Sequence, residues 1–208
     1  MKKVAILIDG SFLLKSYRDF TGKNIKESKI ITLSEDLIEK KSEEIFRIFY
    51  YDAPPFEKKL KNPIDKVETD YAKTPTHIAI TKFQDNLAKT DLIAFRKGKL
   101  SFADWKIGKS AYEKIRAGGK VGSVNASDFI PDFKQKGVDI KIGLDIAWLS
   151  TKRIVDKIIL VTADNDFVPA MKFARKEGVH VAVAKIGKLT SEMYKHSDYI
   201  IEVDLKKY

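Results

Sequence analysis

The chain contains no cysteine among its 208 residues. This absence excludes disulfide bonds, zinc sites with thiolate ligands and catalysis by a thiol nucleophile. A chain without disulfides fits a reducing compartment, and we expect the protein to be cytoplasmic. Hydrophobic residues make up 44% of the chain and charged residues 33%, which are the proportions of a globular protein with a proper core.

Long hydrophobic runs are also missing. The amino terminus, MKKVAILIDG, begins like a secretion signal, but its apolar stretch VAILI ends at Asp9. That stretch is too short for a signal peptide, and no other run approaches the length that spans a membrane. We therefore interpret residues 3–9 as a first β-strand and expect no membrane partner.

Histidine is scarce, which limits the chemistry available. The three histidines, His77, His180 and His196, lack the spacing of metal ligands and are expected to be structural or exposed. Ser11 has no evident histidine and acid partner, so a hydrolase triad is not supported.

Two phosphate-handling motifs are incomplete. The segment AGGKVGS (117–123) is not a phosphate-binding loop, because Val121 stands where such a loop requires Ser or Thr. LIDGS and TADND superficially resemble the motifs of haloacid-dehalogenase-type phosphatases. That chemistry needs a nucleophilic aspartate two residues before Asp9, and Leu7 occupies the position.

Apolar runs alternate with helical patterns along the chain, and this alternation predicts an α/β fold with a mainly parallel central sheet. We predict a single domain of residues 1–208. Strands are expected at 3–9, 45–51, 157–162, 179–184 and 199–203, with a short strand around Ile30, and helices at 11–20, 34–41, 77–89, 139–150, 166–176 and 189–194. Ser11 and Ser34 are the expected N-caps of the first two helices.

Residues 91–130 are expected to form an insertion within that domain. The segment DLIAFRKGKLSFADW (91–105) reads as a hairpin of two strands joined at Lys97-Gly98-Lys99, and residues 106–131 read as a mobile loop.

Four aspartates stand at or near the ends of apolar segments. Asp9 ends the run VAILID, Asp164 and Asp166 follow the run IILV, and Asp145 lies inside the apolar helix of residues 139–150. Carboxylates beyond the ends of parallel strands meet at one edge of the sheet, where α/β folds place their sites. Clustered carboxylates repel one another unless a hard cation binds between them. The pattern therefore indicates a magnesium- or manganese-dependent enzyme that acts on phosphates.

Each aspartate also has a purely structural interpretation. Asp9 and Asp166 could cap helices, and Asp145 could pair with Lys141. Asp139 lies six residues before Asp145 and does not share its helix face, so we interpret it as a helix cap or a secondary member of the site. The conjunction of four aspartates favours the metal-dependent interpretation.

The net charge of +10 is unevenly distributed. Residues 95–120 carry eight basic residues against Asp104 and Glu113, a net charge of +6; they are Arg96, Lys97, Lys99, Lys106, Lys109, Lys114, Arg116 and Lys120. Aromatic residues are interleaved with these charges, so the segment could follow a phosphate backbone and stack bases. The alternative is a solvated, lysine-rich face.

Five segments of the chain together resemble the NYN domain family of PIN-like nucleases, which includes the bacterial LabA-like proteins. They are VAILIDGSFL (4–13), RIFYYDAPP (47–55), KGVDIKIGLDIAWLS (136–150), VTADNDFVPAMKFARKEGVHV (161–181) and LTSEMYKHSDYIIEV (189–203). The resemblance implies a PIN-like three-layer α/β/α sandwich and a metal-dependent ribonuclease. The acidic positions of the family fall on Asp9, Asp139, Asp145, Asp164 and Asp166. Where many members have an asparagine shortly after the first aspartate, this chain has Ser11, which we expect to supply the polar contact.

We therefore expect a nuclease that hydrolyses RNA with Mg²⁺ or Mn²⁺. Asp9, Asp145, Asp164 and Asp166 are the expected catalytic residues and metal ligands, with Asp139 as a further ligand. The expected nucleic-acid contacts are Ser11, Arg96, Lys97, Lys99, Lys106, Lys109 and Lys120. The alternatives are an RNA-binding regulatory module of the same fold without catalysis, and a nuclease directed at DNA. Aromatic residues around Tyr50 and Phe56 are an alternative dimer interface.

Overall fold

The computed structural model describes residues 1–118 and 124–208, and the chain separates into two compact units. We call Met1–Asp52, Phe83–Gly98 and Gly137–Tyr208 the sheet unit, and Ala53–Lys82 and Lys99–Lys136 the ribbon unit. Within the described ranges, no helix combines the length and the apolar character needed to cross a membrane.

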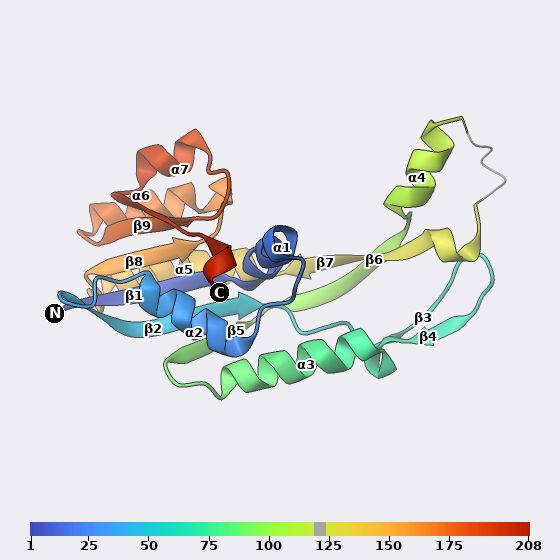
Figure 1. The fold of residues 1–208 in the computed structure, drawn as a ribbon, viewed down its shortest axis with the longest axis horizontal. Coiled ribbons are helices and arrows are strands. Elements are labelled where there is room, and N and C mark those ends of the chain that lie inside the picture. The colour runs from blue at the N-terminus through green and yellow to red at the C-terminus, as the bar shows by residue number, and fades with distance from the viewer. Residues whose placement is uncertain (119–123) are drawn as a thin grey trace. The chain divides into compact units, whose positions relative to one another are not determined.

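The sheet unit is built on six parallel strands (Figure 1). They are β1 (Lys2–Asp9), β2 (Glu43–Asp52), β5 (Ile93–Lys97), β8 (Lys157–Val161), β9 (His180–Lys185) and β10 (Tyr199–Glu202), in the order β10-β9-β8-β1-β2-β5. The order reverses between β1 and β8, because the chain first builds the sheet outward through β2 and β5 and then returns to the other side of β1. Such a reversal is where α/β sheets open a site at the carboxyl ends of their strands.

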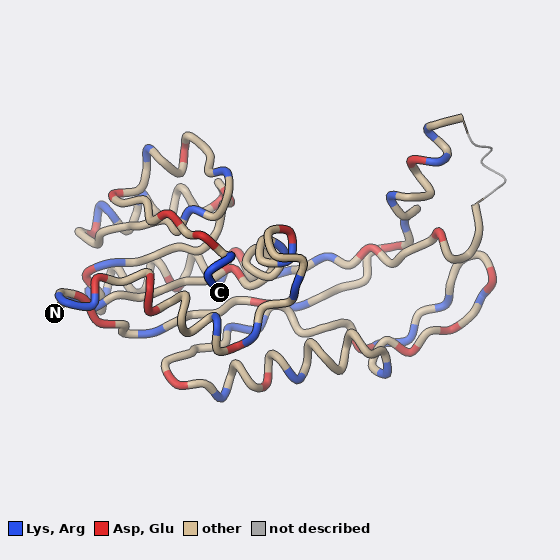
Figure 2. Tube along the Cα trace, viewed as in Figure 1, with Lys and Arg blue, Asp and Glu red and all other residues tan. Residues whose placement is uncertain are grey.

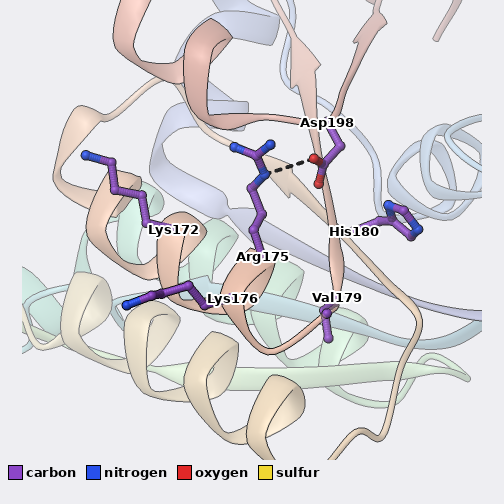
Figure 3. Close-up of a pocket in the computed structure, with 7 residues that line it drawn as sticks. Lys172, Arg175, Lys176, Val179, His180 and Asp198 are labelled. Atoms are coloured by element: carbon purple, nitrogen blue, oxygen red, sulfur yellow. Dashed lines mark hydrogen bonds and ion pairs between the residues drawn. The ribbon is translucent and has the colours of Figure 1, made fainter.

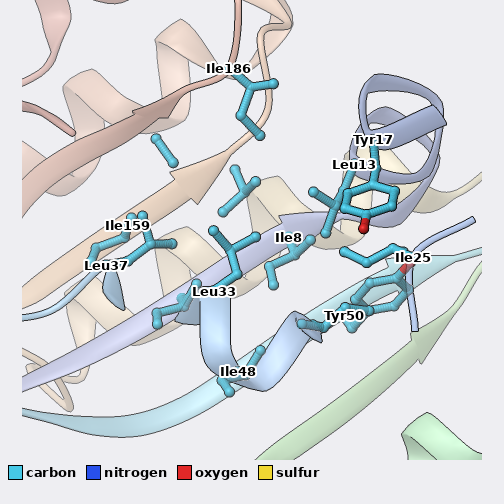
Figure 4. Close-up of a cluster of buried hydrophobic side chains, with 14 of the residues drawn as sticks. Ile8, Leu13, Tyr17, Ile25, Leu33, Leu37, Ile48, Tyr50, Ile159 and Ile186 are labelled. Carbon is cyan, nitrogen blue, oxygen red and sulfur yellow. The ribbon is translucent and has the colours of Figure 1, made fainter. Parts of the chain in front are cut away.

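Apolar side chains of the central strands alternate between two cores, one on each face of the sheet. Ile6 and Ile8 of β1 enter the first core, to which α1 and α2 contribute Leu13 and Leu33 (Figure 4). Leu7 points to the second core, which α5, α6 and α7 cover. The expected three-layer α/β/α sandwich with a parallel central sheet is therefore confirmed.

The helices of the structure are α1 (Gly10–Thr21), α2 (Glu27–Asp36), α3 (Pro75–Ala88), α4 (Lys109–Arg116), α5 (Val138–Thr151), α6 (Val168–Lys176) and α7 (Ser191–His196). Short 3₁₀ turns occur at Tyr71–Lys73, Ala126–Asp128, Asn165–Phe167 and Leu205–Lys207. The predicted strand around Ile30 and the helix starting at Ser34 are wrong. Both residues belong to α2, where Ser34 is buried and its hydroxyl donates to the carbonyl of Ile30 at 2.8 Å.

The ribbon unit contains two antiparallel pairs of strands. β3 (Lys59–Lys61) pairs with β4 (Glu68–Asp70), and β6 (Lys99–Ile107) pairs with β7 (Phe129–Lys136). The hairpin predicted over 91–105 is wrong, because β5 joins β2 in the parallel sheet while β6 pairs with β7. The loop predicted over 106–131 instead contains α4 and the start of β7, and part of it lies outside the described residues.

Five aromatic rings form the core of the ribbon unit: Phe56, Tyr71, Phe102, Trp105 and Phe133. Phe133 lies at the centre, with its ring centroid 4.9 Å from that of Phe56 and 5.5 Å from that of Tyr71. All five residues are half-buried. Phe102 and Trp105 of β6, which the sequence suggested could stack bases, are thus packed against other rings.

Candidate functional site

The carboxylate of Asp9 is fixed at the end of β1, the central strand. Its Oδ1 accepts hydrogen bonds from the backbone N–H of Phe12 at 3.1 Å and from the hydroxyl of Ser11 at 2.9 Å. Asp9 is therefore the N-cap of α1, and the prediction that Ser11 has this role is wrong. The Ser11 hydroxyl instead helps to hold Asp9.

Gly10 allows α1 to begin directly after Asp9. A Cβ atom on Gly10 would lie 2.6 Å from Cε1 of Tyr50 and 2.7 Å from the carbonyl oxygen of Tyr51. Because real Cβ contacts are essentially never this short, only glycine lets the helix start so close to β2. The packing of α1 on β2 thereby determines where the Asp9 carboxylate lies.

Asp164 and Asp166 follow β8, the strand beside β1. The backbone N–H of Asp164 donates to Thr162 Oγ1 at 3.3 Å, and Asp164 Oδ1 accepts from the N–H of Asp166 at 2.9 Å. These bonds form a tight turn that leaves both aspartates exposed. Since β1 and β8 are paired in parallel, Asp9 and the turn lie at the same edge of the sheet.

Asp139, in the first turn of α5, completes an acidic group with Asp9, Asp164 and Asp166. Partial burial raises the pKa of Asp139, and the negative charges of Asp9, Asp164 and Asp166 raise it further. Burial is also the main reason that the pKa of Asp9 is raised; the charge of Asp164 adds to this, while hydrogen bonds from Phe12 and Ser11 oppose it. We call these four residues the acidic cluster.

Asp145, the remaining predicted ligand, has other partners. Its Oδ2 accepts from the hydroxyl of Tyr51 at 2.8 Å, and its Oδ1 pairs with the Arg96 guanidinium at 3.1 Å. Arg96 also stacks over Phe49, 5.4 Å from the ring centroid. Lys141, the partner suggested by the sequence, donates to the carbonyl of Lys97. The structure thus places Asp145 in a network between α5, β2 and β5.

Sequence reasoning missed Asp52, a buried carboxylate that ends β2 as Asp9 ends β1. Its Oδ2 accepts a hydrogen bond from Gln84 at 3.0 Å. The neighbouring hydroxyl of Tyr50 is buried without a hydrogen-bond partner among the described residues. Burial, together with the charges of Asp52 and Asp9, raises the Tyr50 pKa. Because Tyr50 is buried, it cannot contribute to the dimer interface suggested by the sequence. Asp52 could have been found from the sequence, because it follows an apolar run as Asp9 does.

The predicted nucleic-acid contacts are distributed over both units. Ser11 bonds to Asp9, Arg96 pairs with Asp145, and Lys97 ends β5. In the ribbon unit, Lys99 begins β6, Lys106 pairs with Asp132 and Lys109 pairs with Glu113. Lys120 lies outside the described residues. Figure 2 shows charges of both signs along the ribbon unit. One oppositely charged pair there is Lys59 of β3 with Glu68 of β4.

A hollow of about 660 Å³ lies at the amino end of β9, and Figure 3 shows the residues that line it. Arg175 Nε donates to Asp198 Oδ1 at 2.8 Å, and Asp198 Oδ2 accepts from the N–H of Val181. Lys172 and Lys176 point away from this ion pair. Because the strands are parallel, the hollow is at the opposite end of the sheet from the acidic cluster and is not part of it.

The donor atoms of the acidic cluster are all carboxylate oxygens, the type that Mg²⁺ and Mn²⁺ prefer. In the two ranges that the structure describes, no three acidic or histidine side chains are close enough to hold an ion together. Mg²⁺ is typically bound through one or two carboxylates, with water and substrate phosphate completing its shell. The cluster therefore suits such an ion by its donor chemistry and by the raised pKa values that a cation would reverse.

Comparison with known proteins supports the assignment of the fold as a PIN-like three-layer α/β/α sandwich. Residues 3–204 match the family model described as NYN domain. An uncharacterized protein of Methanocaldococcus jannaschii, MJ0482, is 29% identical over 115 residues, which cover 54% of this chain and 48% of that protein. The match thus spans about half the length of this curated relative.

A solved structure shares the fold. The crystal structure of VPA0982, a protein of unknown function from Vibrio parahaemolyticus, aligns with a TM-score of 0.53 and 14% identity over 98% of this chain and 93% of that one. The family resemblance deduced from the sequence is confirmed by the family match. The chain belongs to the NYN domain family, whose fold is nuclease-like and whose PIN-like relatives usually use divalent metal ions.

Proposed function

We propose that the protein is a metal-dependent ribonuclease that hydrolyses RNA phosphodiester bonds at the acidic cluster. The observation that carries this proposal is the placement of Asp9 and Asp164 at or just beyond the carboxyl ends of the paired parallel strands β1 and β8, with Asp166 in the same turn as Asp164. Asp139, in the first turn of α5, is within electrostatic reach of all three. Asp9 ends β1 and Asp164 follows β8, the two strands between which the strand order reverses. A divalent cation would relieve the mutual repulsion of these carboxylates.

In this proposal the acidic cluster holds Mg²⁺ or Mn²⁺. When bound, the ion supplies an activated water and neutralises the charge that develops on the leaving oxygen. Ser11 and the N–H of Phe12 hold the Asp9 carboxylate in place, and Thr162 and the N–H of Asp166 hold the turn at Asp164. Both carboxylates are therefore oriented before any ligand arrives.

The metal-binding role predicted for Asp145 remains a prediction. Both of its oxygens are occupied, by Tyr51 and by Arg96. Each carboxylate oxygen has two lone pairs, so direct coordination by Asp145 would use the lone pairs that these two hydrogen bonds leave free. In the present arrangement Asp145 holds the Arg96 guanidinium, and Arg96 is a predicted phosphate contact.

The decisive experiment compares a labelled mixed-sequence RNA with its DNA equivalent, in Mn²⁺, Mg²⁺ or chelator. The wild-type protein should cut RNA only with metal, and the variant carrying both Asp9→Asn and Asp164→Asn should not cut. Asp19→Asn, which changes an exposed aspartate of α1, is the matched control and should cut normally.

Each alternative outcome has a distinct meaning. Cleavage that survives in the double variant points to a contaminating nuclease, and preferential cutting of DNA indicates a DNA-directed enzyme. RNA binding that weakens with salt but never leads to cleavage identifies a binding module. A thermal melt with and without Mn²⁺ tests metal binding independently, because binding to the folded state raises the melting temperature of the wild type.

A further inference from the structure

Three residues on neighbouring strands of the sheet unit stand in one row. Asp9 of β1 is in register with Tyr51 of β2, and Tyr51 is in register with Arg96 of β5. Residues paired in this way project from the same face of a sheet, and adjacent strands are about 4.8 Å apart. The row therefore places Arg96 two strands, or about 10 Å, from Asp9 of the acidic cluster, on the face that α5 covers.

The contacts of Arg96 orient its guanidinium group. Its Nη2 donates to Asp145 Oδ1 at 3.1 Å, and the group stacks over the ring of Phe49. The other oxygen of Asp145, Oδ2, accepts from the hydroxyl of Tyr51 at 2.8 Å, and Tyr51 is fully buried. The Tyr51 hydroxyl therefore fixes the carboxylate of Asp145, and that carboxylate fixes the guanidinium group.

These contacts leave most of the hydrogen-bonding capacity of Arg96 unused. A guanidinium group carries five N–H donors and commonly forms a two-nitrogen fork with a carboxylate. Among the described residues, Arg96 instead makes a single hydrogen bond to Asp145, and its Nε is buried without a partner. An unpaired buried donor is costly, which argues against a purely structural role. Because its side chain is 42% exposed, the group is held in place and is still accessible to an anion.

We propose that Arg96 binds a phosphate of the RNA strand that flanks the cleavage site, and that Tyr51, acting through Asp145, is the positioning residue for this contact. The inference rests on the function proposed above and assigns a role to Tyr51, which has none there. A guanidinium group matches the oxygens of a phosphate through paired N–H donors. Its distance of about 10 Å from Asp9 separates its charge from an ion at the acidic cluster, so the two charges would contact different phosphates.

The first test measures RNA affinity by fluorescence anisotropy in chelator at several salt concentrations, so that neither metal binding nor cleavage enters the result. Arg96→Gln should weaken binding about 10-fold and reduce the slope of log affinity against log salt by about 1, because one phosphate contact is lost. Arg96→Lys should keep the slope and recover part of the affinity, because the charge remains but the paired donors do not. Arg47→Gln, which removes another arginine that stacks on an aromatic ring, is the matched control and should change neither.

The second test isolates Tyr51 with a double-mutant cycle. Tyr51→Phe removes only the hydroxyl and should weaken RNA binding a few-fold. Added to Arg96→Gln, the same change should cost no further affinity, because a positioning residue acts only through the group that it holds. A purely structural role would instead lower the affinity equally in both backgrounds. Circular dichroism and melting temperatures of all variants establish that each is folded.

The outcomes separate this inference from the proposed function. If the wild type cuts RNA with Mn²⁺ while Arg96→Gln binds RNA with unchanged affinity and salt slope, the inference is overturned and the ribonuclease proposal stands. Losses of affinity that add in the double variant overturn the role of Tyr51. A salt slope that depends on Arg96 in a protein that never cuts RNA supports the phosphate contact and contradicts the ribonuclease proposal. A wild type that binds no RNA overturns both.

Discussion

The sheet unit and the ribbon unit are stabilised by different means and carry different charges. The sheet unit has two extended aliphatic cores, whereas the ribbon unit has a cluster of five aromatic rings. The ribbon unit contains 14 lysines and arginines against 8 acidic residues, so it holds +6 of the net charge of +10. The sheet unit contributes the acidic cluster. In the function that we propose, the sheet unit performs the chemistry and the ribbon unit binds the nucleic acid.

The largest expected effect separates two aspartates of the same helix, α5. Asp139→Asn should lower RNA cleavage by at least about 100-fold, because loss of a group beside the metal costs more than loss of its outer partners. Asp145→Asn should instead destabilise the protein by about 1–3 kcal/mol, because Arg96 and Tyr51 lose a charged partner. Cleavage rates and urea unfolding of both variants provide the measurement.

The reverse result would reassign the site. If Asp145→Asn abolished cleavage without loss of stability while Asp139→Asn remained active, the metal would be held as the sequence first suggested.

The second prediction concerns the aromatic cluster. Phe133→Ala should destabilise the ribbon unit by about 1–3 kcal/mol, because Phe133 is half-buried and contacts three other rings. Amide hydrogen exchange should accelerate in β6 and β7 and remain unchanged in β1 and β8. Tyr112→Ala, which removes an exposed ring from α4, should leave exchange unaltered. RNA binding lost from a fully folded Phe133→Ala protein would show that the cluster stacks bases instead.

The same contrast explains what the sequence could predict. The strands of the sheet unit are short apolar runs such as VAILI, and parallel strands buried on both faces require such runs. Their positions and the fold class were therefore predictable. Helix α2 was missed because Ser34 was interpreted as an N-cap. In the structure Ser34 lies within α2, and its hydroxyl donates to the carbonyl of Ile30. Pairing in the ribbon unit was missed because β6 and β7 are separated by α4 and their register depends on contacts distant in sequence.

The site was only partly predictable for a related reason. Asp9 and Asp164 follow adjacent strands, so their proximity follows from the strand order. The relation of Asp139 and Asp145 to the site depends on how α5 is rotated against the sheet, which the sequence pattern of a helix that is apolar on every side cannot determine. The Tyr51 and Arg96 partners of Asp145 lie on other strands, 94 and 49 residues away.

The third prediction tests the ribbon unit as a binding surface. On β7, Asp132 is flanked by Lys106 at 2.6 Å and Lys134 at 2.8 Å, which leaves one excess positive charge. Lys106→Ala and Lys134→Ala should each weaken RNA binding a few-fold and reduce the slope of log affinity against log salt by about 1. Lys40→Ala, in the sheet unit, is the control and should change neither. The measurement is RNA affinity by fluorescence anisotropy at several salt concentrations. A salt slope that is unaltered in both variants would show that the ribbon unit does not contact the RNA.

The smallest expected effect is the pH dependence of stability, which should have opposite signs in the two units. The pKa of Asp139 is raised by partial burial and by the other carboxylates of the acidic cluster. Its stabilising contribution is therefore present at acid pH and is lost as the pH rises through that pKa. The pKa of Asp132 is lowered by its hydrogen bonds to Lys106 and Lys134, so its contribution is lost as the pH falls.

Matched asparagine variants isolate the two contributions. Asp139→Asn should melt at the same temperature as the wild type in acid and at a higher temperature at neutral pH, because the variant carries no charge to repel Asp9. Adding Mn²⁺ at neutral pH should narrow that difference by stabilising the wild type alone. Asp132→Asn should melt lower than the wild type at neutral pH and approach it in acid. If both variants differed from the wild type in melting temperature with the same sign at neutral pH, the sheet unit would not concentrate negative charge. The proposal that the two units have different roles would then be wrong.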